Sequence, residues 1–245
     1  MRDGWEAEAR TWAAFARTPG HDWAHDDINL PALCELLPGP CGRTLDLGCG
    51  EGRISRYLRS AGHLVAGADT SPTLVRLAAG HPDAAPAVVA DAAALPFPDE
   101  TFGLVVANMC LHDMDHMPRA VAEASRVLAP GGRLCASIPH PVNSAGAFRG
   151  AGPDAPFLIA GSYLDTAPAD WVADREGIRL TFHSEHRPIE AYSRALEGAG
   201  LLIEAIRETR APDAMVAAAP ARRRWQRIPL ALHLRAVKPW PGAGP

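Results

Sequence analysis

The chain has 245 residues, of which 47% are hydrophobic and 21% charged, and its formal net charge at neutral pH is -4. A chain of this length and apolar content can bury a large core in one α/β domain. The acidic balance argues against a general nucleic-acid binder, and no apolar run approaches the roughly 20 residues needed to span a membrane.

The first eight residues lack the apolar core of a signal peptide, so we expect a cytoplasmic protein. The single lysine, Lys238, and the abundance of Ala, Gly, Pro and Arg are typical of a GC-rich bacterial genome. The five cysteines are odd in number and contain no C-x-x-C pair. We therefore expect reduced thiols, with neither a disulfide framework nor a zinc cluster.

The N-terminal part of the chain predicts two helices, at 5–17 and 30–37, separated by the polar segment 19–27. A short apolar strand follows at 43–48 and runs into three alternating glycines, Gly48, Gly50 and Gly52. The segment 53–61 has helical apolar spacing, so its helix begins at about Gly52. A glycine-rich turn between a strand and a helix lets the backbone approach a ligand closely, although such turns also occur for purely structural reasons.

The residues of this turn indicate which ligand it suits. A dinucleotide fingerprint reads G-x-G-x-x-G, but Arg53 stands where its third glycine belongs. Asp46 would repel a pyrophosphate, whereas a carboxylate suits a ligand with a cationic amino group and a sulfonium. S-adenosylmethionine carries both groups, and we expect the turn to bind it rather than a nicotinamide cofactor.

The next elements continue an alternation of strands and helices. Strands are predicted at 63–69, 86–90, 102–108 and 132–138, with helices at 73–79 and 118–128 between them. Ser71 and Pro72 supply the N-cap and first turn of the first of these helices. The second strand ends in Asp69, about 20 residues past the glycines, where a ribose-binding carboxylate is expected. Right-handed crossovers make these strands parallel.

Four phrases in this region occur in a distinctive order: Leu45-Asp46-Leu47-Gly48-Cys49-Gly50-Glu51-Gly52, Gly67-Ala68-Asp69-Thr70-Ser71, Asp91-Ala92-Ala93-Ala94-Leu95-Pro96-Phe97 and Glu123-Ala124-Ser125-Arg126-Val127-Leu128-Ala129-Pro130-Gly131-Gly132. On these phrases the chain resembles the class I S-adenosylmethionine-dependent methyltransferases, in the small-molecule branch that includes ubiquinone and menaquinone biosynthesis enzymes. The resemblance is close over residues 43–139. It implies S-adenosylmethionine as cofactor and S-adenosylhomocysteine as its product.

The resemblance also implies roles for individual residues. The glycine turn lines the methionine part of the cofactor, Asp69 bonds the ribose hydroxyls, and Asp91 faces the adenine amino group. Strand ends attract aspartate simply as a turn former, but three acids at three cofactor positions make that explanation weaker. The predicted cofactor-binding residues are Asp46, Gly48, Gly50, Gly52, Asp69, Thr70, Asp91, Ala92 and Asn108.

The C-terminal half completes the expected fold. After an irregular substrate-side insert at 140–176, the sequence predicts a strand at 177–182, a helix at 188–199 and strands at 200–206 and 228–236. The resemblance implies a Rossmann-like, doubly wound sheet of seven strands in the order 3-2-1-4-5-7-6, with strand 7 antiparallel. We expect a single domain, 1–245, composed of an N-terminal helical cover (1–38), a cofactor-binding core (43–139), the insert, and a C-terminal sheet half (177–240).

Substrate chemistry is expected beyond the carboxyl ends of the strands, which selects His112 and His140 as candidate bases. Histidine titrates near neutrality, and a hydroxyl acceptor must lose a proton. Each has a structural alternative, as a residue of a polar turn or of a strand end. His112 and His116 are spaced like zinc ligands on a helix, but Pro118 places them in a loop and further ligands are not evident, so no metal is expected.

The sequence thus predicts methyl transfer from S-adenosylmethionine to a small-molecule acceptor, with O-methylation slightly favoured over N- or C-methylation. Two alternatives stay open: an enzyme of the same fold that catalyses a cyclisation or elimination, and a non-catalytic binding protein. No nucleic-acid or membrane partner is expected. The acceptor, the methylated atom and the oligomeric state do not follow from the sequence.

Overall fold

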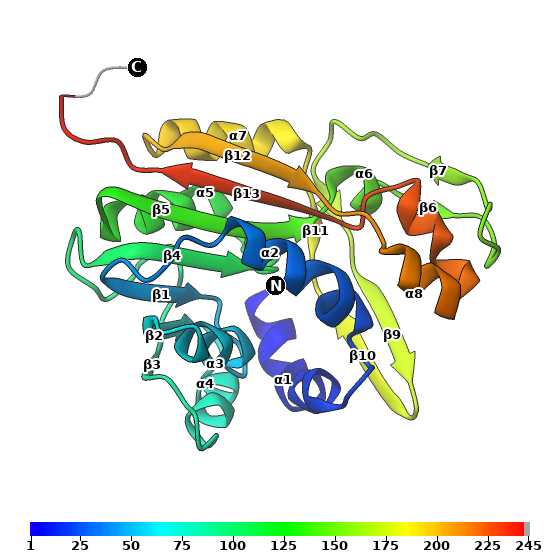
Figure 1. Cartoon of the computed structure of the whole chain (residues 1–245), viewed down its shortest axis with the longest axis horizontal. Coiled ribbons are helices and arrows are strands. Elements are labelled where there is room, and N and C mark those ends of the chain that lie inside the picture. Colours follow the sequence, from blue (N-terminus) through cyan, green and yellow to red (C-terminus); the bar gives the residue numbers. More distant parts are fainter. Residues whose placement is uncertain (243–245) are drawn as a thin grey trace.

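The computed structural model describes residues 1–242, and its centre is one seven-stranded sheet with the strand order β12-β13-β5-β4-β1-β2-β3 (Figure 1). The strands are β1 (Arg43–Leu47), β2 (Leu64–Asp69), β3 (Ala87–Val89), β4 (Phe102–Asn108), β5 (Leu128–Pro139), β12 (Leu202–Glu208) and β13 (Ala231–Val237). β1 to β5 run parallel, whereas β13 is antiparallel to both β5 and β12. The predicted order 3-2-1-4-5-7-6 is confirmed.

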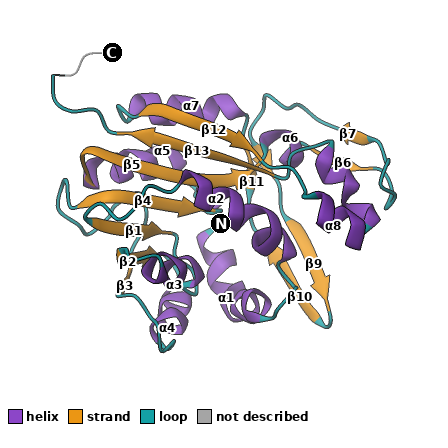
Figure 2. Cartoon of the chain, in the orientation of Figure 1, coloured by secondary structure: helices purple, strands orange, loops and turns teal. Residues whose placement is uncertain are grey.

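Helices cover both faces of the sheet, as Figure 2 shows. They are α2 (Leu30–Leu36), α3 (Arg53–Ser60), α4 (Pro72–Ala79), α5 (Met117–Val127) and α7 (Ile189–Gly198). Alternate residues of β4 point to opposite faces, so that Val105 packs with α5 and α7 while Leu104 packs with α2 and α3. Burial on both faces explains why the strands are apolar runs rather than alternating ones.

Local signals set the boundaries of the helices beside the sheet. Gly52, with φ 88°, is the N-cap of α3, and the Ser71 hydroxyl accepts a hydrogen bond from Leu74 N in the first turn of α4. α5 begins at Met117, one residue before the predicted start. β5 begins at Leu128, four residues early, because the bulged segment before Arg133 already pairs with Phe102. The other strand predictions agree with the structure to within a few residues.

The insert contains more regular structure than its composition indicated. After α6 (Pro141–Ser144) come three small antiparallel pairs: β6 (Gly146–Phe148) with β7 (Phe157–Ile159), β8 (Ala167–Pro168) with β11 (Glu185–His186), and β9 (Trp171–Arg175) with β10 (Ile178–Phe182). The β9–β10 hairpin lies against α1 (Arg2–Arg17), where Phe15, Ala173 and Leu180 form a small core of their own (Figure 1). We call helix α1 and the β9–β10 hairpin together the cover.

Two further segments complete the cover. A π-helical turn, η1 (His25–Asn29), leads directly into α2, where the sequence indicated a polar connection. Burial of Ile28 and Asn29 explains the ordered turn. On the C-terminal side, α8 (Asp213–Ala218) and a 3-10 helix, η3 (Pro220–Gln226), pack Met215 against Ile28. The short 3-10 helix η2 (Leu111–Asp113) follows β4.

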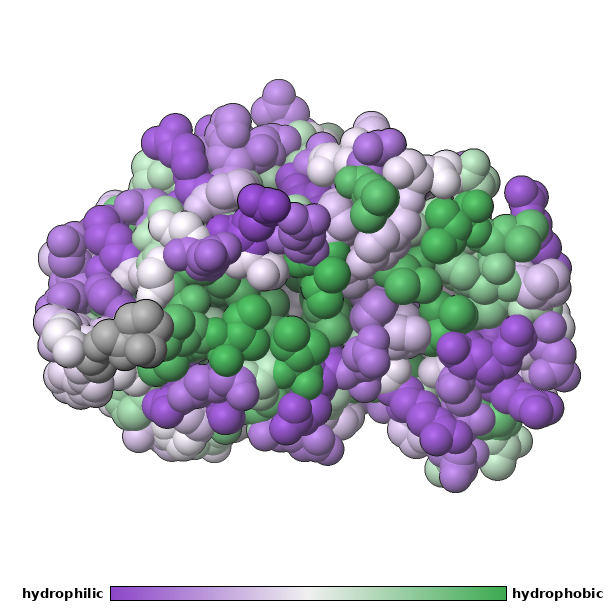
Figure 3. Space-filling model, turned by 90° about the horizontal axis from the view of Figure 1, so that it is seen from above, coloured by the Kyte–Doolittle hydropathy of each residue, from purple (hydrophilic) through white to green (hydrophobic). Residues whose placement is uncertain are grey.

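The edge strand β12 carries the exposed apolar side chains Leu202, Ile203 and Ile206. The space-filling view from above has apolar patches beside polar ones on this side of the molecule (Figure 3). Among residues 1–242, no helix is long and apolar enough to cross a membrane.

The packing predicts where a side chain can be shortened to alanine without loss of stability. Leu104, fully buried on the central strand β4, touches the core beneath α2 and α3, whereas Leu64 on β2 is 65% exposed. Leu104→Ala should lower the free energy of unfolding by about 2 to 5 kcal/mol through lost contacts and a cavity. Leu64→Ala should change it by less than about 0.5 kcal/mol. Urea denaturation of both variants measures the difference, and equal costs would contradict this assignment of the core.

Candidate functional site

A cavity of about 890 Å³ opens beyond the carboxyl ends of the central strands. Ligand cavities in proteins span roughly 300 to 1,000 Å³, so this one has room for two small molecules side by side. Its sheet-side wall comes from the loops after β1, β2, β3 and β4, and its cover from α1, η1, the β9–β10 hairpin and η3. This is the end of an open α/β sheet at which ligands bind.

The turn after β1 forms part of that wall through Gly48 and Gly50. Both have positive φ, at 67° and 55°, a conformation that favours glycine. A Cβ atom on Gly48 would also lie 2.6 Å from the Cβ of Cys110, so a larger residue is excluded on steric grounds. Gly52 does not line the cavity and instead caps α3. The turn is thus shaped by two glycines at the cavity and one behind it.

Asp69 joins this turn to the next one. Its Oδ2 accepts a hydrogen bond from Gly50 N, and its Oδ1 accepts one from Ser71 N, both at 2.8 Å. Burial raises the pKa of the Asp69 carboxyl, and the two backbone donors oppose that shift. Because each carboxylate oxygen has further lone pairs, Asp69 retains acceptor capacity toward the cavity that it lines.

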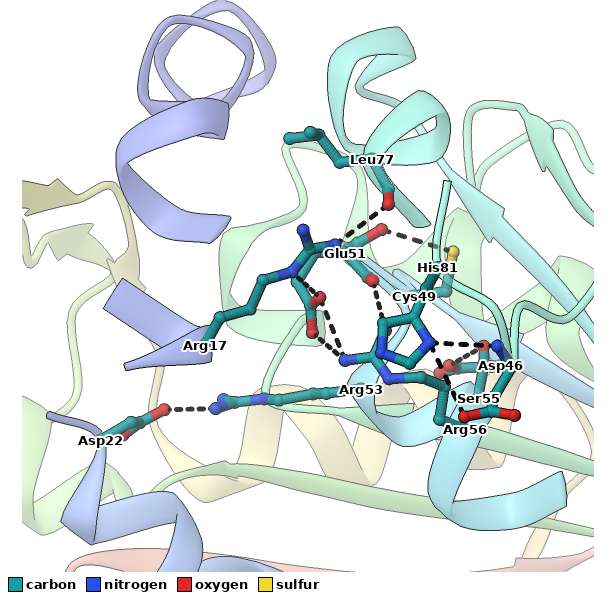
Figure 4. A network of polar contacts seen from close by, with 12 residues as sticks. Arg17, Asp22, Asp46, Cys49, Glu51, Arg53, Ser55, Arg56, Leu77 and His81 are labelled. Carbon is teal, nitrogen blue, oxygen red and sulfur yellow. Dashed lines mark hydrogen bonds and ion pairs between the residues drawn. The ribbon is translucent and has the colours of Figure 1, made fainter. Parts of the chain in front are cut away.

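Asp46 lies beneath the turn and outside the residues that line the cavity. It is 1% exposed, and the Ser55 hydroxyl donates to its Oδ2 at 2.6 Å (Figure 4). Burial raises the pKa of Asp46 to about 7, with the hydrogen bond from Ser55 opposing the shift. Its observed contact joins β1 to α3, so it acts on the cavity through the turn rather than from the wall.

Glu51, a residue that sequence reasoning did not select, anchors the N-terminal helix to the same turn. Its carboxylate is 1% exposed and pairs with Arg17 from α1 at 2.7 Å and with Arg56 from α3 at 2.8 Å (Figure 4). Arg17 also donates to the carbonyl of Leu77. The local sequence shows an acid inside a glycine turn, but it does not reveal that Arg17, 34 residues away, is a partner of this acid.

The remaining predicted cofactor residues lie together on the sheet-side wall. Thr70, Asp91, Ala92 and Asn108 all line the cavity, and the Oδ1 of Asp91 accepts from Ala93 N at 2.8 Å. Asn108 Oδ1 accepts from Ser137 Oγ at 2.7 Å and from Asn29 Nδ2 at 3.1 Å. Asn29 reaches this wall from the N-terminal cover, 79 residues away, and no local pattern identified it.

His112 also lines the cavity, in the turn after β4. Burial, and secondarily the nearby Arg187, lower its pKa to about 3, so the imidazole is neutral at physiological pH. Its Nε2 lies 3.1 Å from Asp113 Oδ1, while Nδ1 is buried without a hydrogen-bond partner among residues 1–242. Burial raises the pKa of Asp113, against the opposing charge of Arg187.

Arg187 holds this turn in place. It is 7% exposed, donates to the carbonyls of His112 and Met114 at 3.1 and 2.8 Å, and pairs with Glu185. The buried guanidinium finds its acceptors more than 70 residues away in the chain, which local patterns do not reveal.

His140, the other predicted base, is not among the cavity-lining residues. It is the N-cap of α6: its Nδ1 accepts from Val142 N at 3.1 Å, and its Nε2 lies 2.9 Å from Glu208 Oε1. Burial lowers its pKa, which Glu208 opposes. With both ring nitrogens engaged outside the cavity, its geometry is that of a cap. Within the described range 1–242, no group of three or more His, Cys, Asp or Glu side chains is arranged to hold a metal ion.

The buried Asp46 generates a pH prediction. Its pKa rises from the ordinary 3.8 to about 7 on folding, so between about pH 4 and 7 the folded protein binds more protons than the unfolded chain. The contribution of Asp46 to the free energy of unfolding should therefore decrease as the pH rises through this window, while His25, His112 and His233, whose pKa values are lowered by burial, contribute in the opposite direction. Asp46→Asn, which retains an acceptor for Ser55, should reduce this decrease. Urea denaturation across the window measures it, and parallel curves for the two proteins would contradict the assignment.

Comparison with known proteins places this geometry in a family. Residues 45–136 match the family model described as "Methyltransferase domain". The chain is 37% identical over 126 residues to malonyl-[acyl-carrier protein] O-methyltransferase of Enterobacter lignolyticus, and 32% identical over 106 residues to demethylmenaquinone methyltransferase of Tropheryma whipplei. These alignments cover 50% and 42% of this chain and 50% and 44% of those proteins, so it spans about half the length of the curated relatives it matches.

A solved structure extends the likeness beyond the core. The crystal structure of an S-adenosylmethionine-dependent methyltransferase from Mesorhizobium loti matches with a TM-score of 0.71 and 28% identity, over 84% of this chain and 96% of that one. The four phrases, the strand order and these comparisons agree. Residues 45–136 thus match a methyltransferase domain, and the fold of the described chain is that of an S-adenosylmethionine-dependent methyltransferase.

Proposed function

We propose that this protein transfers a methyl group from S-adenosylmethionine to a small-molecule acceptor. The observation that carries the proposal is the position of Asp69, which lines the cavity while both of its oxygens fix the adjoining backbone turns. A carboxylate held in this way is a rigid acceptor for the two hydroxyls of a ribose. The match of residues 45–136 to a methyltransferase domain supports the same reaction.

The charges on the sheet-side wall support a cationic cofactor. Asp69 and Asp91 line this wall, and Arg53, which also lines the cavity, is paired with Asp22 at 2.7 Å (Figure 4). Carboxylates without a free cation disfavour a pyrophosphate and favour a sulfonium with an amino group. Asn29 also lines the cavity. Its buried Oδ1 has no hydrogen-bond partner within the described chain, and it suits a donor such as that amino group.

We assign the cofactor-binding roles on this basis. Asp69 accepts from the ribose hydroxyls, Asp91 and Ala92 contact the adenine, and Gly48 and Gly50 lie along the methionine part. Thr70 and Asn108 complete the wall. Asp46 and Gly52 act from beneath, because they shape the turn without lining the cavity.

When bound, S-adenosylmethionine supplies a methyl group on a sulfonium, a leaving group that needs no protonation. The protein's task is then alignment and exclusion of water. Trp12 and Trp23 from the N-terminal cover and Trp171 from the hairpin line the side of the cavity opposite the sheet. An aromatic cover anchored to the turn through Arg17 and Glu51 keeps the reacting groups dry and close together.

His112 is the residue best placed to accept a hydrogen bond from an acceptor hydroxyl. Burial lowers its pKa to about 3, so the ring is neutral beside a cationic cofactor but is a weak base, and its role is to orient the hydroxyl by accepting a hydrogen bond. Its Nδ1 is buried and has no partner within residues 1–242, so the ring must turn to present this acceptor to the cavity. We favour O-methylation for this reason, and the O-methyltransferase relatives point the same way. An acceptor that reacts without losing a proton, such as the lone pair of an amine, would make this histidine dispensable.

An acceptor screen tests the reaction itself. The protein is incubated with S-adenosylmethionine carrying a deuterated methyl group and a library of phenols, alcohols, acids and amines, and products are detected by mass spectrometry. With a hydroxyl acceptor, His112→Ala should lower the turnover rate by about tenfold or more, as expected for loss of a hydrogen bond that orients the hydroxyl, whereas His140→Ala should leave it nearly unchanged. Equal losses would contradict the role of His112.

The screen also separates the alternatives. An enzyme that catalyses a cyclisation or elimination would convert a substrate without releasing S-adenosylhomocysteine. A non-catalytic binding protein would bind the cofactor and convert nothing. Labelled methyl groups in a product, with release of S-adenosylhomocysteine, support methyl transfer against both.

Asp69→Ala tests the cofactor assignment directly. Loss of the hydrogen bonds to the ribose should weaken S-adenosylhomocysteine binding by about 1 to 3 kcal/mol, measured by calorimetry. Asp83→Ala, at an exposed carboxylate outside the cavity, is the matched control and should bind like the native protein. Circular dichroism verifies that both variants fold. Unchanged affinity in folded Asp69→Ala would refute the assignment.

A further inference from the structure

The cavity has a second wall whose charge is opposite to that of the cofactor side. It is formed by lining residues from two segments, 139–147 at and after the end of β5 and 224–230 from the last turn of η3 to the start of β13. None of the lining residues in these segments is acidic, and Arg224 is their only charged member. The others are small or apolar, such as Gly146, Ala147 and Leu230, or neutral and polar, such as Asn143 and Ser144.

Arg224 differs from its neighbours in the sequence. Arg222 pairs with Asp27 and Arg223 with Asp154, each at 3.6 Å, and Arg227 donates to the carbonyl of Ala155 at 3.0 Å. Arg224 has no acidic oxygen within 4.0 Å among residues 1–242, and its Nε is buried without a hydrogen-bond partner. Of this basic run, it is also the arginine that lines the cavity.

Aromatic rings hold the Arg224 guanidinium in place. Its Cζ lies 5.3 Å from the centre of the Phe148 ring and 5.5 Å from that of Trp225, and these two rings meet edge to face at 5.2 Å. Such contacts attract a cation and fix its plane, but they satisfy none of its N–H donors. A partly desolvated guanidinium with open donors is a preformed receptor for an anion.

A second arginine adds to the positive potential on this side. Arg175, on β9, lines the cavity and lies over Phe15 and Trp23, and it too lacks an acidic oxygen within 4.0 Å in the described part of the chain. Arg222 approaches the same Trp23 ring at 4.4 Å. Of the acids that line the cavity, Asp69, Asp91 and Asp113 follow strands of the sheet. The others are already paired: Asp22 with Arg53, Glu51 with Arg17, Asp115 with the N-terminal amine, Asp170 with His183 and Glu185 with Arg187.

We propose that Arg224 binds an oxyanion, a carboxylate or a phosphate, carried by the acceptor molecule. The planar fork of the guanidinium matches two oxygens of either group. Phe148 and Trp225 beside it suit an acceptor whose remaining part is apolar or aromatic. That this anion belongs to the methyl acceptor rests on the proposed function, whereas the anion site itself is independent of it.

The test is a titration of the native protein, followed by the ¹⁵N resonance of the Arg224 Nε–H group, which is identified by its absence in Arg224→Gln. The probes are sodium benzoate and sodium phosphate, added at constant ionic strength against sodium chloride. At least one probe should move this resonance saturably, with a dissociation constant in the millimolar range. Whichever binds more tightly identifies carboxylate or phosphate as the preferred group. A resonance that neither probe moves would overturn the proposal.

Variants make the assignment specific. Arg224→Gln should weaken binding of the better probe by about tenfold or more, since a hydrogen bond to a charged group is lost. Arg224→Lys, which keeps the charge and loses the fork, should fall between this variant and the native protein. Arg223→Gln is the matched control, because Arg223 is paired outside the cavity, and should bind like native protein. Equal losses in the Arg223 and Arg224 variants would refute a specific site.

The failure of this proposal is distinguishable from that of the proposed function. Calorimetric binding of S-adenosylhomocysteine by Arg224→Gln at native affinity demonstrates that the variant is folded and the cofactor wall intact. Saturable benzoate or phosphate binding by a protein that does not bind S-adenosylhomocysteine would leave the anion site standing and remove the methyltransferase activity. Cofactor binding without anion binding would refute the anion site and leave the proposed methyl transfer standing.

Discussion

The site depends on one carboxylate with two backbone partners. Asp69, at the end of β2, accepts from Gly50 N in the turn after β1 and from Ser71 N in the turn before α4. These two bonds fix the relative position of adjacent loops, and they orient the acid toward the cavity that it lines. Gly48 can approach Cys110 closely only because it has no side chain. The cofactor wall therefore follows from a few backbone constraints rather than from a large set of side chains.

The cover depends on that wall in turn. Glu51 is buried in the same turn and binds Arg17, so the N-terminal helix is tied to the glycine turn. Asn29, in the π-helical turn, donates a hydrogen bond to Asn108. The β9–β10 hairpin then packs on the helix through Phe15 and Leu180. On the side of the cavity away from the sheet, Arg175 and Arg224 lack acidic partners among residues 1–242, whereas the acids Asp170 and Glu185 are paired with His183 and Arg187. This arrangement suits a cationic cofactor facing an anionic acceptor.

Local sequence signals predicted most of the fold. The cap at Ser71, the glycine at 52 and the apolar runs of the strands each act within a few residues, and the structure has them where they were expected. Seven predicted cofactor positions share one cavity, because strand ends of a parallel sheet meet at one edge. Asp46 and His140 follow the same rule but bond beneath or beside that edge. Asn29, Arg187 and Arg224 escaped prediction because their roles depend on residues far away in the chain or, for Arg224, on the absence of a partner.

The central claim is that the sheet-side wall binds an adenosyl sulfonium cofactor, and calorimetric titration of the native protein tests it most directly. S-adenosylmethionine and S-adenosylhomocysteine are the ligands, and NAD, with its pyrophosphate, is the control. We expect micromolar dissociation constants for at least one adenosyl ligand and no measurable binding of NAD, because the acids of the wall repel a pyrophosphate. Binding of NAD, or no binding of either adenosyl ligand to protein demonstrated to be folded, would contradict the account.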